Sequence, residues 1–152
     1  IGLMILKNEP YLIEFNVRMG DPECQTILPI LDTDLAEIIL ACCNKKLQDI
    51  DIKWKNKKSV CIVLCSNGYP DSYKKNIIIN GLKNLKIDRN EYIFHAGTVI
   101  KDDKYLAIGG RVLNVIVTTE NFKNSKEKAI KILNDLDWKD GFFRKDIAYK
   151  VT

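Results

Sequence analysis

The residues from Ile13 to Met19 alternate between apolar and polar types, and the polar ones could handle a metal-bound phosphate. Glu14, Asn16 and Arg18 occupy every second position, and on an extended strand such side chains share one face, about 6.5 to 7 Å from one another. Carboxylate and amide oxygens suit Mg²⁺, and a guanidinium suits a phosphoryl group. These are the groups that a phosphoryl-transfer site requires on its protein side.

Alternation by itself is more typical of an ordinary strand with one solvent-facing side. The continuation gives the pattern more weight, because the strand runs directly into Gly20-Asp21-Pro22. Asp21 is suited to cap a short helix and Pro22 to open it. The free backbone N–H groups at such a helix start favour an anion.

The elements before residue 50 must position these side chains. Gly2–Leu6 and Tyr11–Met19 are predicted to form a β-hairpin joined at Lys7–Pro10. Apolar residues at helical spacing predict a helix from Asp34 to about Leu47. The lysine-rich segment Gln48–Lys58 then loses periodicity, which places a domain boundary there. We therefore expect one unit over residues 1–50 and another over 51–152.

The second unit is predicted to be built on antiparallel strands. Ser59–Cys65 is a continuous apolar run, as expected for a strand buried on both faces. A helix is predicted from Asn124 or Ser125 to Leu136, with an apolar inner face. Short links favour antiparallel pairing, and the fold class expected is α+β, the end of one domain followed by a small, mainly antiparallel β domain with packed helices. Further strands are predicted at Asn76–Ile79, Tyr92–Ile100, Tyr105–Ile108 and Arg111–Thr118.

Composition excludes some classes of protein. No apolar run approaches the roughly 18 residues that a membrane span requires, so we expect no membrane partner. The net charge of +4 is spread over lysines that are best interpreted as a solvated surface, so we expect no nucleic-acid partner. Five cysteines is an odd number, and the adjacent Cys42 and Cys43 are poorly placed to pair, which favours a reducing cytoplasm.

The segment Glu14–Gln25, written EFNVRMGDPECQ, closely resembles the signature of the phosphoribosylamine glycine ligase family, also called glycinamide ribonucleotide synthetases. Met19 and Cys24 stand where Phe and Thr are usual, and neither departure touches a ligand-type residue of the pattern. The resemblance spans nearly the whole chain. It continues through Asn67–Pro70, Phe94–Thr98, Gly109–Val115 and Phe143–Ile147.

The resemblance implies an ATP-grasp enzyme of purine biosynthesis that joins glycine to phosphoribosylamine and converts ATP to ADP and phosphate. In the family's pattern, Glu14 and Asn16 match ligands of Mg²⁺ or Mn²⁺. By resemblance to the wider ATP-grasp group, Arg18 would stabilise a glycyl phosphate intermediate. The loop Gly20-Asp21-Pro22 would help to hold glycine or the ribonucleotide.

Other residues carry weaker expectations. Gly68 and Tyr69 could border the ribonucleotide, or could form an ordinary turn. Arg111 follows two glycines and could reach a phosphate or carboxylate in the cleft, or could make a structural salt bridge. His95 is the only histidine and is expected to be structural.

Parts that the reaction needs are not found in the sequence: a Gly-rich phosphate loop, an adenine-binding hinge and an upstream carboxylate for the metal site. We therefore expect that the chain begins inside a domain, that its N-terminal partner is the rest of the same enzyme, and that it has no ligase activity alone. Two rival interpretations stay open. One is a fragment of another ATP-grasp carboxylate–amine ligase or carboxylase, and the other is a non-catalytic binding domain.

Overall fold

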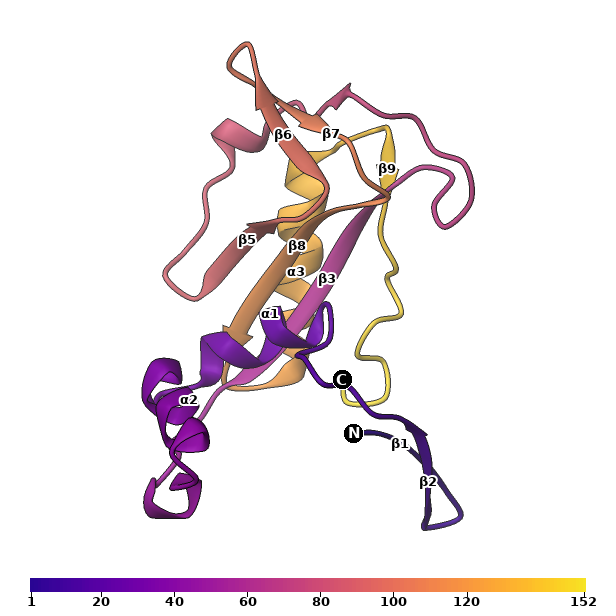
Figure 1. Ribbon diagram of the computed structural model, residues 1–152. Coiled ribbons are helices and arrows are strands. Elements are labelled where there is room, and N and C mark those ends of the chain that lie inside the picture. Colours follow the sequence, from indigo (N-terminus) through magenta and orange to yellow (C-terminus); the bar gives the residue numbers. More distant parts are fainter.

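The computed structural model describes residues 1–152 and has three antiparallel sheets (Figure 1). The largest has the strand order β5-β8-β3-β9, with β3 and β8 at its centre. Every strand pair is antiparallel, which confirms the predicted α+β class with mainly antiparallel strands. The strands of this sheet are β3 (Lys58–Ser66), β5 (Glu91–His95), β8 (Arg111–Thr119) and β9 (Gly141–Phe142).

The central strand β3 confirms the strand predicted at Ser59–Cys65. It pairs along its length with β8, with Ile62 opposite Val115. Both residues are buried, as the continuous apolar run requires of a strand covered on two sides. Alternate β3 residues face different layers, since Ile62 belongs to the core cluster while Cys61 contacts Thr26 on the opposite face.

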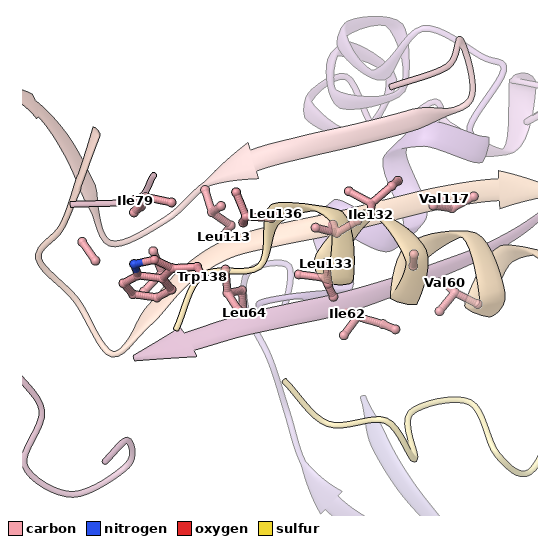
Figure 2. Close-up of a cluster of buried hydrophobic side chains, with 14 residues drawn as sticks. Val60, Ile62, Leu64, Ile79, Leu113, Val117, Ile132, Leu133, Leu136 and Trp138 are labelled. Atoms are coloured by element: carbon pink, nitrogen blue, oxygen red, sulfur yellow. The ribbon is translucent and has the colours of Figure 1, made fainter. Parts of the chain in front are cut away.

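Helix α3 (Phe122–Leu136) covers one face of this sheet and supplies the core. The predicted inner-face residues Ala129, Ile132, Leu133 and Leu136 are all buried. They interdigitate with β3 and β8 side chains such as Ile62 and Leu113 (Figure 2). Removing this apolar surface from water stabilises the sheet and the helix together.

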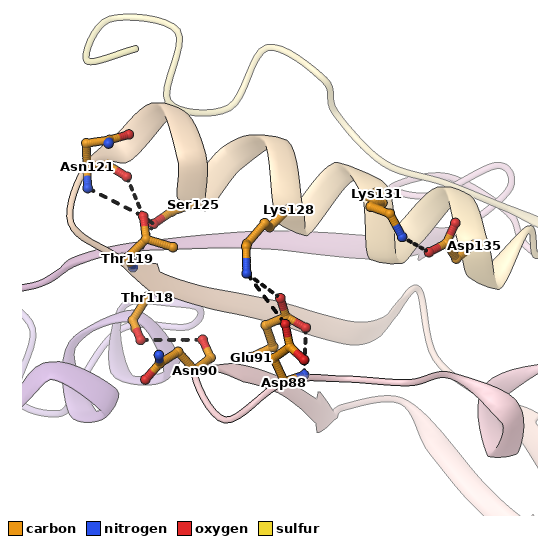
Figure 3. A network of polar contacts seen from close by, with 10 residues as sticks. All are labelled: Asp88, Asn90, Glu91, Thr118, Thr119, Asn121, Ser125, Lys128, Lys131 and Asp135. Carbon is orange, nitrogen blue, oxygen red and sulfur yellow. Dashed lines mark hydrogen bonds and ion pairs between the residues drawn. The ribbon is translucent and has the colours of Figure 1, made fainter.

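The start of α3 differs from the prediction, which placed it at Asn124 or Ser125. The N-cap is Asn121, whose Oδ1 accepts a hydrogen bond from the amide of Asn124 at 2.8 Å. Ser125 lies inside the helix, fully buried, and its hydroxyl donates to the carbonyl of Lys58 at 2.8 Å. Figure 3 shows the neighbouring contact of Ser125 with Thr119, whose hydroxyl oxygens lie 2.9 Å apart.

The strand predicted at Tyr92–Ile100 is two strands in two sheets. β5 pairs with β8, whereas β6 (Thr98–Lys101) pairs with β7 (Lys104–Ala107). The change occurs at Gly97, where a Cβ would lie 2.6 Å from the Cα of Gly109. This close backbone approach redirects the chain, a role that favours glycine. The third strand of the smaller sheet is β4 (Ile77–Ile78), shorter than the predicted Asn76–Ile79.

The N-terminal hairpin consists of β1 (Gly2–Leu6) and β2 (Glu9–Glu14) and projects away from the main sheet (Figure 1). Its connection is shorter than predicted. Lys7 and Asn8 both have positive φ, 52° and 66°, as in the two-residue turns that suit the twist of a hairpin. Glu9 and Pro10, expected in the loop, belong to β2.

Short helices connect the hairpin to β3. They are α1 (Glu23–Ile27), the 3₁₀ turn η1 (Leu28–Ile30), α2 (Leu35–Cys43) and the 3₁₀ turn η2 (Leu47–Asp49). α2 ends four residues before the predicted Leu47 because Lys45 has a positive φ of 56°, which a continuing helix does not allow. A third 3₁₀ turn, η3 (Leu82–Asn84), precedes β5. None of the helices is long and apolar enough to cross a membrane.

Candidate functional site

The strand that should carry Glu14, Asn16 and Arg18 ends earlier than predicted. The pairing of β2 stops at Glu14, opposite Gly2, and the chain bends at Val17 and Arg18. The predicted strand end at Met19 is therefore wrong.

The three side chains remain available to ligands. Glu14 and Arg18 are exposed, and Asn16 is half-buried. The Arg18 guanidinium donates a hydrogen bond to the carbonyl of Met19 at 2.9 Å, and no hydrogen bond or ion pair joins it to Glu14 or Asn16. The metal and phosphoryl roles of these residues thus stay predictions.

The loop Gly20–Pro22 leads into α1, but Asp21 does not cap that helix as predicted. The N-cap position is Pro22, with no side-chain hydrogen bond. The Asp21 carboxylate points elsewhere: its Oδ1 accepts a hydrogen bond from Gln25 Nε2 at 2.8 Å, and its Oδ2 lies 2.9 Å from Arg111 Nη2. The carboxylate is thus held between α1 and β8.

Arg111 makes the salt bridge that was one of its two expected roles. Its Nη1 also donates to the backbone carbonyl of Asp21, at 3.4 Å. The two residues are 90 positions apart, and their side chains are 42% and 45% exposed. The contact joins two of the segments that carry the family resemblance, the loop after the hairpin and the Gly109–Val115 segment.

Tyr69 lies next to this pair, in the predicted turn Asn67–Pro70. Gly68 in that turn has a φ of 96°, a conformation that favours glycine. The Tyr69 ring packs directly on Gly110, where a Cβ would lie 2.1 Å from the ring carbon Cδ2. Gly110 therefore lets the aromatic ring approach the backbone immediately before Arg111.

A cavity of about 400 Å³ lies between the Gly20–Pro22 loop and the sheet. Its walls are mostly apolar, and Arg144 is the charged residue among them. The lining residues are Pro22, Cys61, Val63, Cys65, Tyr69, Pro70, Phe142, Arg144 and Ile147. The cavity thus brings Pro22 and Tyr69, two predicted substrate-binding residues, to one hollow.

The two thiols in this cavity are poorly suited to act as nucleophiles. Burial raises the pKa of Cys61 to about 11, which a hydrogen bond from Thr26 opposes. Burial also raises the pKa of Cys65, although the positive charge of Arg111 acts in the opposite direction. Neutral thiols of this kind behave as small apolar residues.

The sequence reasoning did not single out Gln25 as a site residue. The sequence feature that could have identified Gln25 is its position four residues after Asp21, because residues four apart lie on the same side of a helical turn. His95, expected to be structural, has its Nδ1 2.8 Å from Thr98 Oγ1, and its ring stacks on Tyr105.

The sequence of the chain also matches a known domain family. The family described as Phosphoribosylglycinamide synthetase, C domain, matches residues 59–150. The chain belongs to this family. The phosphoribosylglycinamide synthetase match begins next to the first residue of β3 and covers the main sheet and α3.

Relatives of this synthetase family extend the likeness to the N-terminal residues. Phosphoribosylamine–glycine ligase of Caldanaerobacter subterraneus is 42% identical over 147 residues, which is 97% of this chain and 34% of the relative. The trifunctional purine biosynthetic protein adenosine-3 of Gallus gallus is 42% identical over 99% of this chain and 15% of its own length. The chain thus spans about a third or less of the relatives that it matches.

A solved structure shares the fold. The phosphoribosylamine–glycine ligase of Thermotoga maritima superposes with a TM-score of 0.73 and 29% sequence identity. The superposition covers 97% of this chain and 36% of the other. The hairpin, the connecting helices and the synthetase C domain therefore occur together in a solved ligase.

Proposed function

We propose that this chain is the C-terminal portion of an ATP-dependent carbon–nitrogen ligase that joins glycine to 5-phosphoribosylamine. The observation that carries the proposal is the contact between Asp21 and Arg111, because it brings two signature segments of the family together in space. The relatives, named phosphoribosylamine–glycine ligases, support the same activity.

The proposed reaction has two steps. A carboxylate oxygen of glycine attacks the γ-phosphorus of ATP. The new O–P bond forms as the bond from the γ-phosphorus to ADP breaks, which gives glycyl phosphate and ADP. The amine of phosphoribosylamine then attacks the acyl carbon, forms the amide, and releases phosphate and a proton. Arg18 would balance charge on the transferring phosphoryl group, as a guanidinium does in such sites.

A divalent ion fits the donor chemistry of the segment that follows β2. Glu14 offers an exposed carboxylate and Asn16 an amide oxygen, which are hard oxygen ligands of the type that Mg²⁺ and Mn²⁺ prefer. Such an ion would neutralise phosphate charge. No group of three or more His, Cys, Asp or Glu side chains is positioned to hold a metal, so the proposed site needs further oxygens from phosphates or another segment.

The proposed substrate contacts lie along the Gly20–Pro22 loop. Gly20, Asp21 and Pro22 would hold glycine or the ribonucleotide, and Gly68 and Tyr69 would border the ribonucleotide; Pro22 and Tyr69 line the same cavity. We also propose that residues 1–50 form the end of an ATP-grasp domain and residues 51–152 the C-terminal domain. The lysine-rich segment before β3 and the family match from residue 59 support this division.

The test uses a full-length ligase that includes this chain. ADP release is measured with glycine and phosphoribosylamine, with bicarbonate in place of glycine as the comparison. We expect turnover that requires both substrates and a divalent ion, and none from residues 1–152 alone. Turnover with bicarbonate instead of glycine would favour an ATP-grasp carboxylase. Salt-dependent binding of nucleic acid without turnover would favour a binding domain.

A further inference from the structure

The backbone on which Arg111 stands is held in place by several hydrogen bonds. Ser66 donates two hydrogen bonds to the residues just before β8. Its amide donates to the carbonyl of Gly110 at 2.8 Å, and its hydroxyl donates to the carbonyl of Gly109 at 2.9 Å. The amide of Gly97 donates to the carbonyl of Arg111 at 2.9 Å. Ser66 itself is buried. Arg111 therefore projects from a fixed part of the main sheet.

The loop that Arg111 meets has fewer supports of its own. Its carbonyls accept local bonds from α1, from the amide of Cys24 to Gly20 at 2.9 Å and from the amide of Thr26 to Pro22 at 3.1 Å. These bonds tie the loop to α1, a helix of only five residues. The carboxylate and the backbone carbonyl of Asp21 both tie the loop to Arg111 on β8.

We propose that Arg111 is a positioning residue for the ligase reaction, which acts by holding Asp21 and thereby sets the orientation of the Gly20–Pro22 loop. This inference depends on the proposed function and assigns a role within the same site. The guanidinium reaches both the carboxylate and the backbone carbonyl of Asp21. Two contacts to one residue fix its direction, which a single point charge does not achieve.

The pair has a larger expected effect on the site than on the fold. Both side chains are about half exposed, and half-exposed ion pairs contribute little to folding stability because solvent screens them. Placement is more sensitive, since misplacing a substrate-holding group by about 1 Å can lower a rate on the order of 100-fold. Loss of the pair should therefore change turnover while Tm stays nearly constant.

A direct role in binding an anionic substrate is the alternative for Arg111. In that case the guanidinium would act on the substrate and independently of Asp21. In the positioning role it acts through Asp21, so removing Arg111 should have a much smaller effect once Asp21 has lost its carboxylate, because only the contact to the backbone carbonyl of residue 21 is left. A double-mutant cycle separates these roles.

The experiment measures kcat and KM of the full-length ligase with Arg111→Ala, Asp21→Asn and both changes together. We expect each single variant to lose roughly tenfold or more in kcat, and Arg111→Ala to cost far less in the Asp21→Asn background, where only its contact to the backbone carbonyl of residue 21 is left to lose. Arg111→Lys should recover part of the rate, because it keeps the charge but not the fork. Equal losses from Arg111→Ala in both backgrounds would overturn the proposal.

A second measurement does not depend on which substrates the enzyme uses. Hydrogen exchange of the peptide covering residues 20–27 should speed up in Arg111→Ala and in Asp21→Asn, because the loop is released from β8. The matched control is Lys131→Ala, which breaks the exposed Lys131–Asp135 pair on α3 and should change neither exchange nor kcat. Unchanged exchange in Arg111→Ala would reject the positioning role even if the enzyme proves to have another substrate.

Discussion

The indole Nε1 of Trp138 donates a hydrogen bond to the backbone carbonyl of Ile78, at 2.9 Å. This contact joins the segment immediately after α3 to β4 in the smaller sheet, across 60 positions of the sequence. Trp138 is only 8% exposed and belongs to the same core cluster as Ile62 and Leu113. A single side chain thus connects the core of the main sheet with the edge of the second one.

Replacing Trp138 with Phe should lower the free energy of unfolding by about 0.5 to 1.5 kcal/mol, because the partly buried hydrogen bond to the carbonyl of Ile78 is lost. Urea unfolding of the chain would measure this change. Trp54→Phe is the matched control, since Trp54 is 53% exposed and its side chain donates no hydrogen bond. Equal losses in the two variants would contradict the role given to the Trp138 bond.

Much of this core could be predicted because its signals are local. The strand β3 is a continuous apolar run, and the inner face of α3 repeats at helical spacing, so both are visible without any knowledge of their partners. The contact of Asp21 with Arg111 had no such signal. It depends on how two segments 90 positions apart are packed, which no local pattern encodes. Arg111 was therefore left with two alternatives.

The errors in strand limits have the same origin. Residues 13–19 alternate without interruption, yet pairing with β1 stops at Glu14, opposite Gly2. The run Tyr92–Ile100 has ordinary strand residues throughout, yet it changes sheet at Gly97. Strand ends are decided by the neighbouring strand, whereas a sequence pattern reports only which residues would tolerate being in one.

Stability should fall at alkaline pH through Cys61. Its pKa is raised from 9.0 to about 11 in the folded chain because the thiol is buried. Between these values the unfolded chain releases the proton and the folded chain keeps it, so the unfolded state is favoured as pH rises. Below pH 9 the ionisation of Cys61 does not lower the free energy of unfolding. Between pH 9 and the folded pKa, it lowers the free energy of unfolding by about 1.4 kcal/mol for each pH unit.

Urea unfolding of the chain and of Cys61→Ala, at about pH 8 and about pH 10.5, would test this linkage. Other groups titrate in the same range and act on both proteins alike, so the comparison isolates Cys61. We expect the difference in stability between the two proteins to shrink at the higher pH. A difference that stays constant would show that the thiol does not stay protonated in the folded chain.

Replacing Gly110 with Ala should displace Tyr69, because the added Cβ would lie 2.1 Å from the ring. Gly110 has no positive φ, so the backbone itself tolerates alanine. Such overpacking typically costs about 1 to 3 kcal/mol. The double variant Gly110→Ala with Tyr69→Ala removes the clash, and the cost of the Gly110 change should largely disappear in that background. A cost of Gly110→Ala that is the same with and without the Tyr69 ring would contradict the proposed contact.

Replacing Glu14 with Gln in the full-length ligase tests the proposed metal role. A neutral amide holds a hard divalent ion less well than a carboxylate does, so the Mg²⁺ concentration needed for half-maximal rate should rise. Turnover should fall by at least about tenfold, since losing even an outer partner of a metal site costs that much. The control is Glu9→Gln, which changes an equally exposed carboxylate at the other end of β2. We expect Glu9→Gln to leave the Mg²⁺ titration unchanged. If Glu14→Gln also left it unchanged, Glu14 would not be a metal ligand.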